Sequence, residues 1–422
     1  MSAQLQQMNA SEKANFNHLV GDIAWFGLAM AATTRFLSVY AIRLGATPID
    51  LGWISALPAL LVLISASFGA WWGRRYGNLV RSLFLPGLGM RLMFLLPAFA
   101  PLLPVQYQPM WLILSVSIPA LPQGIAAVSF FVIMRGSVDP DRMTHLLSRR
   151  QLAVNVSVAV AVLTFGLWLK GAPFPLNYQV MFLVAFAFSL ISLWHCIRIR
   201  LDAPKPVAEA KPVARYRATE PWRSPGFRRV AFVTALVHMV FFMLVPVIPL
   251  LLVKNLGADE GYMALFGLLE LAGGAAASVI APRVTARVGT RAMIALAMVG
   301  TAFSALLIAA APNLWFALIA AVFSGGCWTA AAGVGLFTLF MDNTPASEAT
   351  TYSTAFHQVI GLAVFVGPMI GSLLANNGVS LILIIGLGAA VRLIAAPLID
   401  TSLITRGWAR LHHEPEALAQ TL

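Results

Sequence analysis

The chain has 422 residues, of which 59% are hydrophobic and only 10% are charged, and its mean hydropathy is +0.82. So few polar residues cannot cover the surface of a soluble protein of this length. The two cysteines, Cys196 and Cys327, both lie in apolar segments and are too few for a disulfide framework or a metal-ligand cluster. The composition therefore indicates an integral membrane protein.

Twelve apolar segments follow one another along the chain, separated by polar, Gly and Pro interruptions. Each is close to the roughly 20 residues that a helix needs to cross the hydrocarbon core. The runs are continuously apolar, which favours helices over the alternating strands of a barrel. The first run is too long for a cleaved signal peptide. The predicted spans are 19–43, 50–72, 80–100, 109–134, 149–169, 176–199, 228–253, 261–282, 290–311, 313–341, 351–376 and 379–402.

The basic residues predict the orientation, because cytoplasmic loops collect Lys and Arg next to the spans. With both termini inside, most of the 28 basic residues lie on the cytoplasmic side, and Arg43, Lys170 and Lys254 lie outside. This bias accounts for the net charge of +12, so nucleic acid is not an expected partner. We expect a multi-pass protein of the cell (plasma or inner) membrane with two cytoplasmic termini. The inside loop 342–350 is acidic and departs from this rule.

Two short motifs recur at one constant interval along the chain. Leu44-Gly45-Ala46 returns as Leu256-Gly257-Ala258, and the turn Arg75-Tyr76-Gly77 returns as Arg287-Val288-Gly289. The chain is therefore predicted to consist of two similar six-helix halves in the same orientation. The predicted parts are a cytoplasmic tail (1–18), a first bundle (19–200), a Pro-, Ala- and charge-rich cytoplasmic linker (201–226), a second bundle (227–404) and a cytoplasmic tail (405–422).

Twelve spans, a repeat of six and six, a basic central loop and the paired basic turns resemble the major facilitator superfamily over essentially the whole chain. The family's turn reads Gly, three variable residues, Asp, Arg, one variable residue, Gly and two basic residues. Arg74 and Ala286 stand at the Asp positions here, which puts in doubt any latch that depends on that Asp. The residues that we assign to this loop motif are Arg74, Arg75, Gly77, Arg81, Arg287, Gly289 and Arg291.

The basic turns have two interpretations. They can serve only as topology determinants that anchor lipid headgroups, or they can also hold the two halves together on the cytoplasmic side. A tight turn between antiparallel helices needs Gly for a positive φ, and flanking arginines can bind helix C-terminal carbonyl groups and lipid phosphate.

An ionisable residue inside a membrane span costs free energy, so such a residue is a functional candidate. Of the 16 acidic residues, Glu270 alone lies near the middle of a predicted span, whereas Asp22 lies near an inner end. We predict Glu270, or Asp22 in its place, as the proton-coupling residue, because burial favours the neutral carboxyl group. The alternative for Glu270 is a structural ion pair with Arg35, Arg91 or Arg392.

The resemblance implies a central cavity surrounded by spans one, four, seven and ten. The alternative roles of the polar and aromatic candidates are hydrogen-bonded core positions for the histidines and packing or lipid contact for the aromatic residues. The residues that we predict to line the cavity are Arg35, Trp25, Phe26, His238, Phe242, Trp328, His357 and Gln358.

The predicted function is secondary active transport by alternating access, with proton-coupled efflux of a small, partly apolar solute. Uptake remains an alternative, because the Gly-Pro signature of many antiporters is missing from span five. A transport-inactive scaffold or sensor that binds pigment, lipid or a partner is a second alternative. No phosphate-binding Gly-Lys-Ser/Thr loop occurs, so ATP is not expected as the energy source. We expect no enzyme activity, no cofactor, no metal and a monomer surrounded by membrane lipid.

Overall fold

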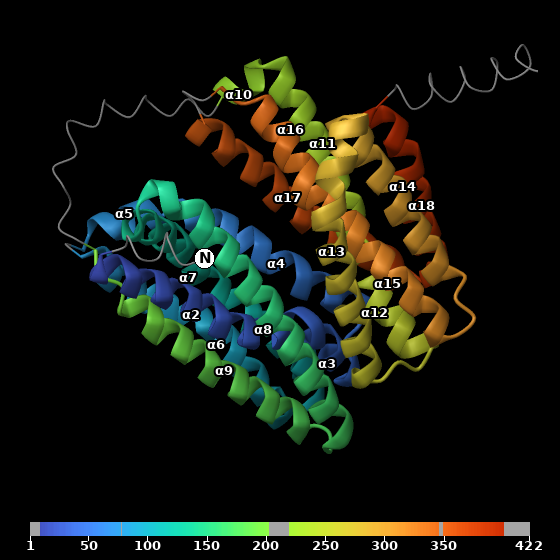
Figure 1. Ribbon diagram of the computed structural model, residues 1–422. Coiled ribbons are helices and arrows are strands. Elements are labelled where there is room, and N and C mark those ends of the chain that lie inside the picture. The colour runs from blue at the N-terminus through green and yellow to red at the C-terminus, as the bar shows by residue number, and fades with distance from the viewer. Residues whose placement is uncertain (1–8, 77, 202–218, 346–348, 401–422) are drawn as a thin grey trace, which may run out of the picture. The chain divides into compact units, whose positions relative to one another are not determined.

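The computed structural model describes residues 9–76, 78–201, 219–345 and 349–400 (Figure 1). In these residues twelve helices are long and apolar enough to cross a membrane, which confirms the predicted all-α, multi-pass fold. They run over Ala10–Arg43, Pro48–Ala66, Val80–Leu102, Val105–Ser137, His145–Gly171, Leu176–Ile197, Pro225–Asn255, Glu260–Val288, Thr290–Ala309, Leu314–Asp342, Thr351–Asn376 and Leu381–Ile399.

The chain divides into two compact units. Unit 1 comprises Met1–Tyr216 and Leu252–Leu268, and unit 2 comprises Arg217–Leu251 and Leu269–Leu422. The segment Leu252–Leu268 thus groups with the first half of the chain although it follows the predicted linker. The main helices before the linker are α2 (Ala10–Ala31), α3 (Leu37–Arg43), α4 (Pro48–Ala66), α5 (Gly69–Arg74), α6 (Leu79–Leu95), α7 (Gln108–Ser137), α8 (Met143–Gly171) and α9 (Leu176–Ile197), with the short helical turns η1 (Ala32–Phe36), η2 (Leu96–Leu102), η3 (Val105–Tyr107) and η4 (Pro140–Arg142).

The helices after the linker repeat this arrangement. They are α10 (Glu220–Arg223), α11 (Pro225–Phe242), α12 (Val247–Leu250), α13 (Glu260–Val288), α14 (Thr290–Ala309), α15 (Leu314–Trp328), α16 (Phe337–Asp342), α17 (Ala349–Asn376) and α18 (Leu381–Ile399), with the turns η5 (Leu251–Asn255) and η6 (Thr329–Leu336).

Equivalent helices pack in the same way in both units. The first span of each half packs on the fifth, as α2 on α8 and as α11 on α17. The third span packs on both the fourth and the sixth, as α6 on α7 and α9 and as α14 on α15 and α18. The predicted repeat of six and six helices is therefore present in the packing as well as in the motifs.

The loop after the first span has the same backbone conformation in both halves. Gly45 has φ +83° and Gly257 has φ +72°, a region that side chains other than Gly rarely adopt. In each half a side chain two residues later caps the next helix. The Oγ of Thr47 accepts a hydrogen bond from the N–H of Asp50, and the Oδ1 of Asp259 accepts one from the N–H of Tyr262.

Helix α2 begins at Ala10, nine residues before the predicted start of the first span. The prediction placed residues 10–18 in a tail because they are polar. Their polar groups are satisfied inside unit 1: the Asn9 side chain caps the helix by accepting from the N–H of Glu12, and the Asn15 side chain donates to the carbonyl groups of Ser137 and Arg200.

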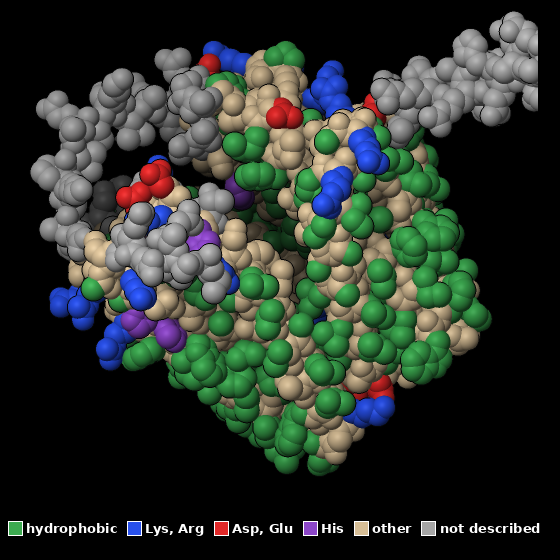
Figure 2. All heavy atoms as spheres, viewed as in Figure 1, with side chains coloured by type: hydrophobic (Ala, Val, Ile, Leu, Met, Phe, Trp, Pro, Cys, Tyr) green, Lys and Arg blue, Asp and Glu red, His purple; other side chains and the backbone are tan. Residues whose placement is uncertain are grey.

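The surface of the described residues fits this topology. Figure 2 shows hydrophobic side chains along the sides of the helices and charged side chains gathered toward the helix ends. Large apolar residues are well exposed in the middle of several spans, for example Val160 and Leu163 on α8 and Ile394 on α18. A soluble protein rarely exposes so much apolar surface, so these faces are suited to lipid.

Candidate substrate and coupling site

Glu270 lies half-buried in α13, where that helix crosses α15. The Oγ of Ser324 on α15 donates a hydrogen bond of 3.2 Å to Oε1 of Glu270. The two helices approach closely at this point because glycines face the partner backbone. A Cβ on Gly273 would lie 2.9 Å from the carbonyl carbon of Val322, so a larger residue would force the helices apart.

An aromatic cluster occupies the neighbouring turn of α15. Trp328 follows Ser324 by four residues and therefore lies on the same face of the helix. Its ring stacks on Phe241 with centroids 3.9 Å apart and meets Phe242 and His238 edge-on at 5.6 and 5.2 Å. The predicted cavity residues His238, Phe242 and Trp328 are thus brought together, with Phe241 as a further member.

Two polar groups hold this cluster in place. The Nδ1 of His238 lies 2.9 Å from the carbonyl oxygen of Thr234, one turn earlier in α11. Arg392 of α18 is 3% exposed, donates to the carbonyl oxygen of Val240 at 3.0 Å and lies 6.0 Å from the centre of the Phe241 ring. Arg392 thus joins α18 to α11 beside the aromatic cluster.

Three π-helical segments interrupt the spans in the described residues, and sequence reasoning had not found them. They are η1 in span one, η5 in span seven and η6, which begins directly after Trp328 in span ten. Such segments break the regular hydrogen-bond ladder and often mark functional sites. In span four, α7 carries Pro119 and Pro122 inside the helix. Three of the four spans that the resemblance places around a cavity therefore contain a π-helical segment, and the fourth contains two internal prolines.

Asp22 has a different environment, in a buried network of unit 1. Its carboxylate accepts hydrogen bonds from the Oγ of Ser192 at 2.7 Å and from the Sγ of Cys196 at 3.0 Å. Arg150 lies 3.3 Å and Arg91 4.0 Å from its oxygens. Asp22 itself is 5% exposed, although it lies near the inner end of its predicted span.

Arg91 is held by the same part of unit 1. Its guanidinium donates to the carbonyl groups of Ser189 and Gly87 at 2.6 and 2.7 Å and to the Oγ of Ser192 at 2.8 Å. Arg91 therefore joins α6 to α9 beside Asp22.

Three candidates of the first span lie elsewhere in unit 1. Trp25 packs on Phe188 with centroids 5.5 Å apart, and Phe26 packs edge-on against Phe94 at 5.7 Å. Arg35 is part of η1, and its side chain lies against Gly267 of α13, where a Cβ would be 3.1 Å from the Cδ of Arg35.

His357 and Gln358 are exposed neighbours on α17. The Nδ1 of His357 lies 2.8 Å from the carbonyl oxygen of Ser353, one turn earlier. Both residues keep free side-chain surface on the helix that packs against α11.

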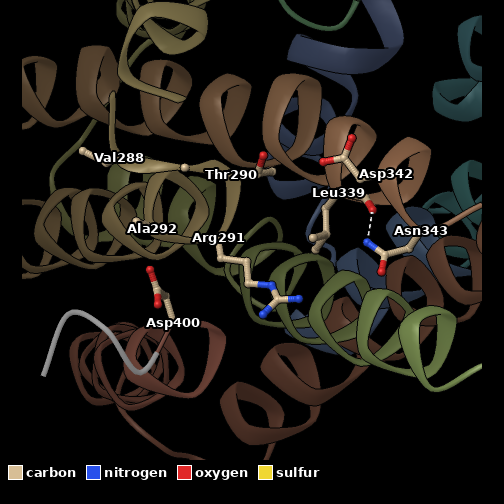
Figure 3. A pocket seen from close by; sticks show the side chains of 9 residues that line it. Val288, Thr290, Arg291, Ala292, Leu339, Asp342, Asn343 and Asp400 are labelled. Carbon is tan, nitrogen blue, oxygen red and sulfur yellow. Dashed lines mark hydrogen bonds between the residues drawn. The ribbon is translucent and has the colours of Figure 1, made fainter. Parts of the chain in front are cut away.

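The basic turn of the second half has the conformation expected of it. Gly289 has φ +88° and ψ 158° and precedes α14. Together with Arg291 it borders a recess of about 370 Å³, which Asp342 of α16 and Asp400 at the end of α18 also line (Figure 3). The acidic loop that departs from the charge rule thus begins next to a basic turn.

The first basic turn is described only in part, because Gly77 lies outside the described residues. Arg74 ends α5, and Arg75 lies 5.9 Å from the ring centre of Trp71. The N–H of Arg81 donates to the Oδ1 of Asn78, which caps α6.

Sequence reasoning missed Glu260, whose exposed fraction of 5% equals that of Asp22. It was placed at the edge of a span, where a carboxylate normally reaches water. In the structure it binds Arg43 and Tyr178, at 3.0 Å each. Its position directly after a repeated Gly loop was the only signal available in the sequence.

Comparison with known proteins agrees with this architecture. Residues 230–403 match the model of the Major Facilitator Superfamily. The class H tetracycline resistance protein of Pasteurella multocida is 28% identical over 150 residues, which span 35% of this chain and 37% of the relative's length.

Solved structures of the same fold cover nearly the whole chain. A bacterial homologue of the iron transporter ferroportin in an inward-facing state has a TM-score of 0.70 at 12% identity, with 92% of this chain and 98% of that chain covered. The nucleoside transporter NupG (TM-score 0.67, 10% identity, 92% and 98% covered) and a D-xylose-proton symporter (0.67, 15%, 93% and 98%) are similar. These structures share the fold of this chain, which is that of a multi-pass membrane protein. Its second half, residues 230–403, is similar to the Major Facilitator Superfamily.

Proposed function

We propose that this transporter exports a small, partly apolar solute from the cell in exchange for protons, with Glu270 as the proton carrier. The observation that carries the proposal is the half-buried carboxylate of Glu270, hydrogen-bonded by Ser324 one helical turn from the stacked ring of Trp328. An ionisable residue inside a membrane span is a functional candidate by default, and Glu270 has a hydroxyl donor and aromatic rings on the neighbouring helix.

The aromatic cluster supports an apolar or aromatic solute. Phe241, Phe242 and Trp328 are all partly exposed, and Trp328 lies one turn of α15 from Ser324, the hydrogen-bond partner of Glu270. Rings of this kind bind flat apolar molecules by stacking and bind organic cations through their faces. A solute that carries both an apolar body and a positive charge would compete with the proton for Glu270, which is the coupling that exchange requires.

The direction of transport is proposed from the partial similarity to a tetracycline resistance protein. Protons that enter from outside would protonate Glu270, release the solute outward and then leave to the cytoplasm. In this proposal both termini and the linker 201–226 are cytoplasmic, in agreement with the bias of the basic residues.

The experiment uses purified protein in liposomes. A thermal-shift screen of aromatic, cationic and neutral solutes, with tetracycline as the first probe, selects a ligand. Its flux is then measured with and without an imposed proton gradient for the native chain, for Glu270→Gln and for Asp141→Asn, an exposed carboxylate outside the spans. Glu270→Gln should bind the ligand but lose gradient-driven accumulation, whereas Asp141→Asn should behave as the native chain.

Undiminished gradient-driven flux by Glu270→Gln would remove Glu270 from the coupling role. Flux that is present but runs only inward would replace export by uptake. A chain that moves no solute of the panel and instead co-purifies with a stable partner would favour the scaffold alternative.

A further inference from the structure

The short segment after α9 is fixed to the first turns of α2, the helix beside it (Figure 1). The side-chain amide of Asn15 donates to the carbonyl oxygen of Arg200 at 2.7 Å, and the Oδ1 of Asn15 accepts from the N–H of Arg200 at 2.9 Å. The side chain of Ile199, between this contact and the helix, is only 4% exposed. The residues that follow α9 are therefore held in one place on unit 1.

Two arginines of this fixed segment lie on its outer side. Arg198 is the C-cap of α9, and Arg200 follows two residues later. Both are exposed, whereas Ile199 between them is buried. The segment thus presents two guanidinium groups at the surface while its apolar residue anchors it.

The two acids of α2 do not neutralise these guanidinium groups. Glu12 forms an ion pair with Arg142. Asp22 is buried and faces Arg91 and Arg150. Among the residues that the structure describes, no carboxylate pairs with either arginine of the segment after α9. This end of unit 1 therefore carries positive charge without a protein counter-charge.

An aromatic group supports the first of the two arginines. The guanidinium carbon of Arg198 lies 4.8 Å from the ring centre of Trp194. The ring of His18 meets Trp194 edge-on at 5.9 Å, and its Nδ1 lies 3.0 Å from the Nδ1 of His195. A Cβ on Gly21 would be 2.7 Å from the Cε1 of His195, so this glycine makes room for the ring. The indole that carries Arg198 is therefore itself held by packing between α2 and α9.

The same face of α9 is apolar toward the middle of the span. Leu190, Ile191, Trp194 and Ile197 are all exposed, and they precede Arg198 at helical spacings of three and four residues. One helix face thus changes from aliphatic to aromatic and then to cationic as it reaches its end. A membrane lipid has the matching order, from acyl chain to charged headgroup.

Helix length places the charged end of this face at the membrane boundary. The first span, Ala10–Arg43, has 34 residues, which corresponds to about 50 Å of helix, whereas the hydrocarbon core is about 30 Å thick. Because Arg43 ends the span at the opposite boundary, the excess length lies at the start of α2, beside Arg198 and Arg200. Trp194 lies in the last turn of span six, and Trp is typical of the headgroup level.

We propose that Arg198 and Arg200, supported by Trp194, form a binding site for the phosphate group of an anionic membrane lipid. Arg binds phosphate oxygens through paired, charge-assisted hydrogen bonds. The acyl chains of the lipid then lie along the apolar face of α9. The basic residues predict that this end of the chain is cytoplasmic, where the leaflet is rich in anionic lipids. The site is separate from Glu270 and does not depend on the proposed transport reaction.

The test uses the purified full chain in an uncharged detergent, without solute or gradient. Phosphatidylglycerol or phosphatidylcholine is added at equal concentrations, and native mass spectrometry measures the lipid that stays bound. We expect phosphatidylglycerol to bind about tenfold more tightly, because the ammonium group of phosphatidylcholine competes with the arginines for the phosphate.

Two variants and one matched control assign the preference. Arg198→Gln and Arg200→Gln should each weaken phosphatidylglycerol binding about tenfold, with little effect on phosphatidylcholine. Both side chains are exposed, so the melting temperature of the lipid-free variants should stay at the native value. Arg283→Gln removes the same charge from an exposed arginine of α13 that donates to the carbonyl oxygen of Val279 on its own helix, and it should bind as the native chain does.

Equal binding of the two lipids by the native chain would overturn the site. Equal losses in Arg198→Gln and Arg283→Gln would also overturn it, because they would show a diffuse attraction to positive charge. Complete displacement of phosphatidylglycerol by inorganic phosphate at the same concentration would make the ligand a soluble phosphate instead of a lipid. Failure of the proposed transport reaction has a separate sign, namely undiminished gradient-driven flux by Glu270→Gln while the lipid preference is intact.

Discussion

Gly325 lies against the backbone of Glu270 so closely that a Cβ at that position would be 2.6 Å from the carbonyl carbon and 2.7 Å from the Cα of Glu270. Real Cβ atoms essentially never come so near to backbone atoms. Gly273, one turn further along α13, has the same relation to Val322 of α15. The candidate coupling residue therefore sits at the tightest type of helix crossing, where small residues allow two backbones to touch.

The substitution Gly325→Ala should separate α13 from α15 and weaken the hydrogen bond between Ser324 and Glu270. Overpacking of this kind costs about 1–3 kcal/mol, so the melting temperature and the folded yield should fall. The melting temperature in detergent is measured by loss of tryptophan fluorescence or by thermal shift. Gly386→Ala on α18 is the matched control, because a Cβ there meets nothing within 4 Å and Ala favours a helix over Gly.

Equal melting temperatures for Gly325→Ala and Gly386→Ala would show that the two helices have room to move apart. The proximity of Gly325 and Glu270 would then place no constraint on the coupling site.

Much of the fold could be predicted from the sequence, because the length of an apolar segment and the basic residues in the adjoining loop are properties of a single helix. The twelve spans, the repeat and the conformation of Gly289 were all predicted from such local patterns. Contacts between helices that are far apart in the sequence were not predicted. Nothing in the pattern around Asp22 indicates Arg150 and Cys196 as its partners, since they come from two other helices of the bundle.

The residues of the candidate site also include some that the sequence could reveal and some that it could not. Glu270 could be found because one acid in the middle of a span stands out. Glu260 could not, since a carboxylate at a span end is normally hydrated and its burial depends on Tyr178, 82 residues away. The start of α2 was placed too late because its polar residues find partners across the bundle rather than in water.

The conformation of Gly289 gives a second prediction, for the basic turn. Its φ of +88° with ψ of 158° lies in a region that is essentially restricted to Gly, and a Cβ there would meet nothing within 4 Å. Gly289→Val should therefore cost about 1–3 kcal/mol through the backbone alone and reduce folded yield. The yield of monodisperse protein on size-exclusion chromatography measures the effect.

Gly171→Val is the matched control for that prediction, because Gly171 also has open space but no positive φ. The corresponding change in the first half, Gly77→Val, is expected to behave like Gly289→Val, and Arg75→Lys should be milder than either. Equal yields of Gly289→Val and Gly171→Val would show that the turn does not require a positive φ at position 289.

The proposed orientation gives a third prediction. Cysteine at position 210, in the linker, should not react with an impermeant thiol reagent added to intact cells, after Cys196 and Cys327 are replaced by Ser. Gln106→Cys, at an exposed site in η3 at the start of span four, should react readily. Permeabilised cells should label both positions. Labelling of position 210 in intact cells would reverse the topology.

The network around Asp22 gives the last prediction, which separates a structural carboxylate from a coupling one. Asp22 lies within 4.0 Å of two arginines, Arg91 and Arg150, and all three side chains are largely buried. Asp22→Asn leaves two guanidinium groups in the bundle without their counter-charge, and removal of one partner from a buried pair costs about 3–5 kcal/mol. We therefore expect Asp22→Asn to lower the melting temperature strongly, whereas Glu270→Gln, which retains a polar partner for Ser324, should lower it little. Thermal shift of both purified variants beside Asp141→Asn measures the difference. A stable Asp22→Asn protein that binds solute but has lost gradient-driven flux would transfer the coupling role to Asp22, because only a proton carrier loses coupling while its fold is kept.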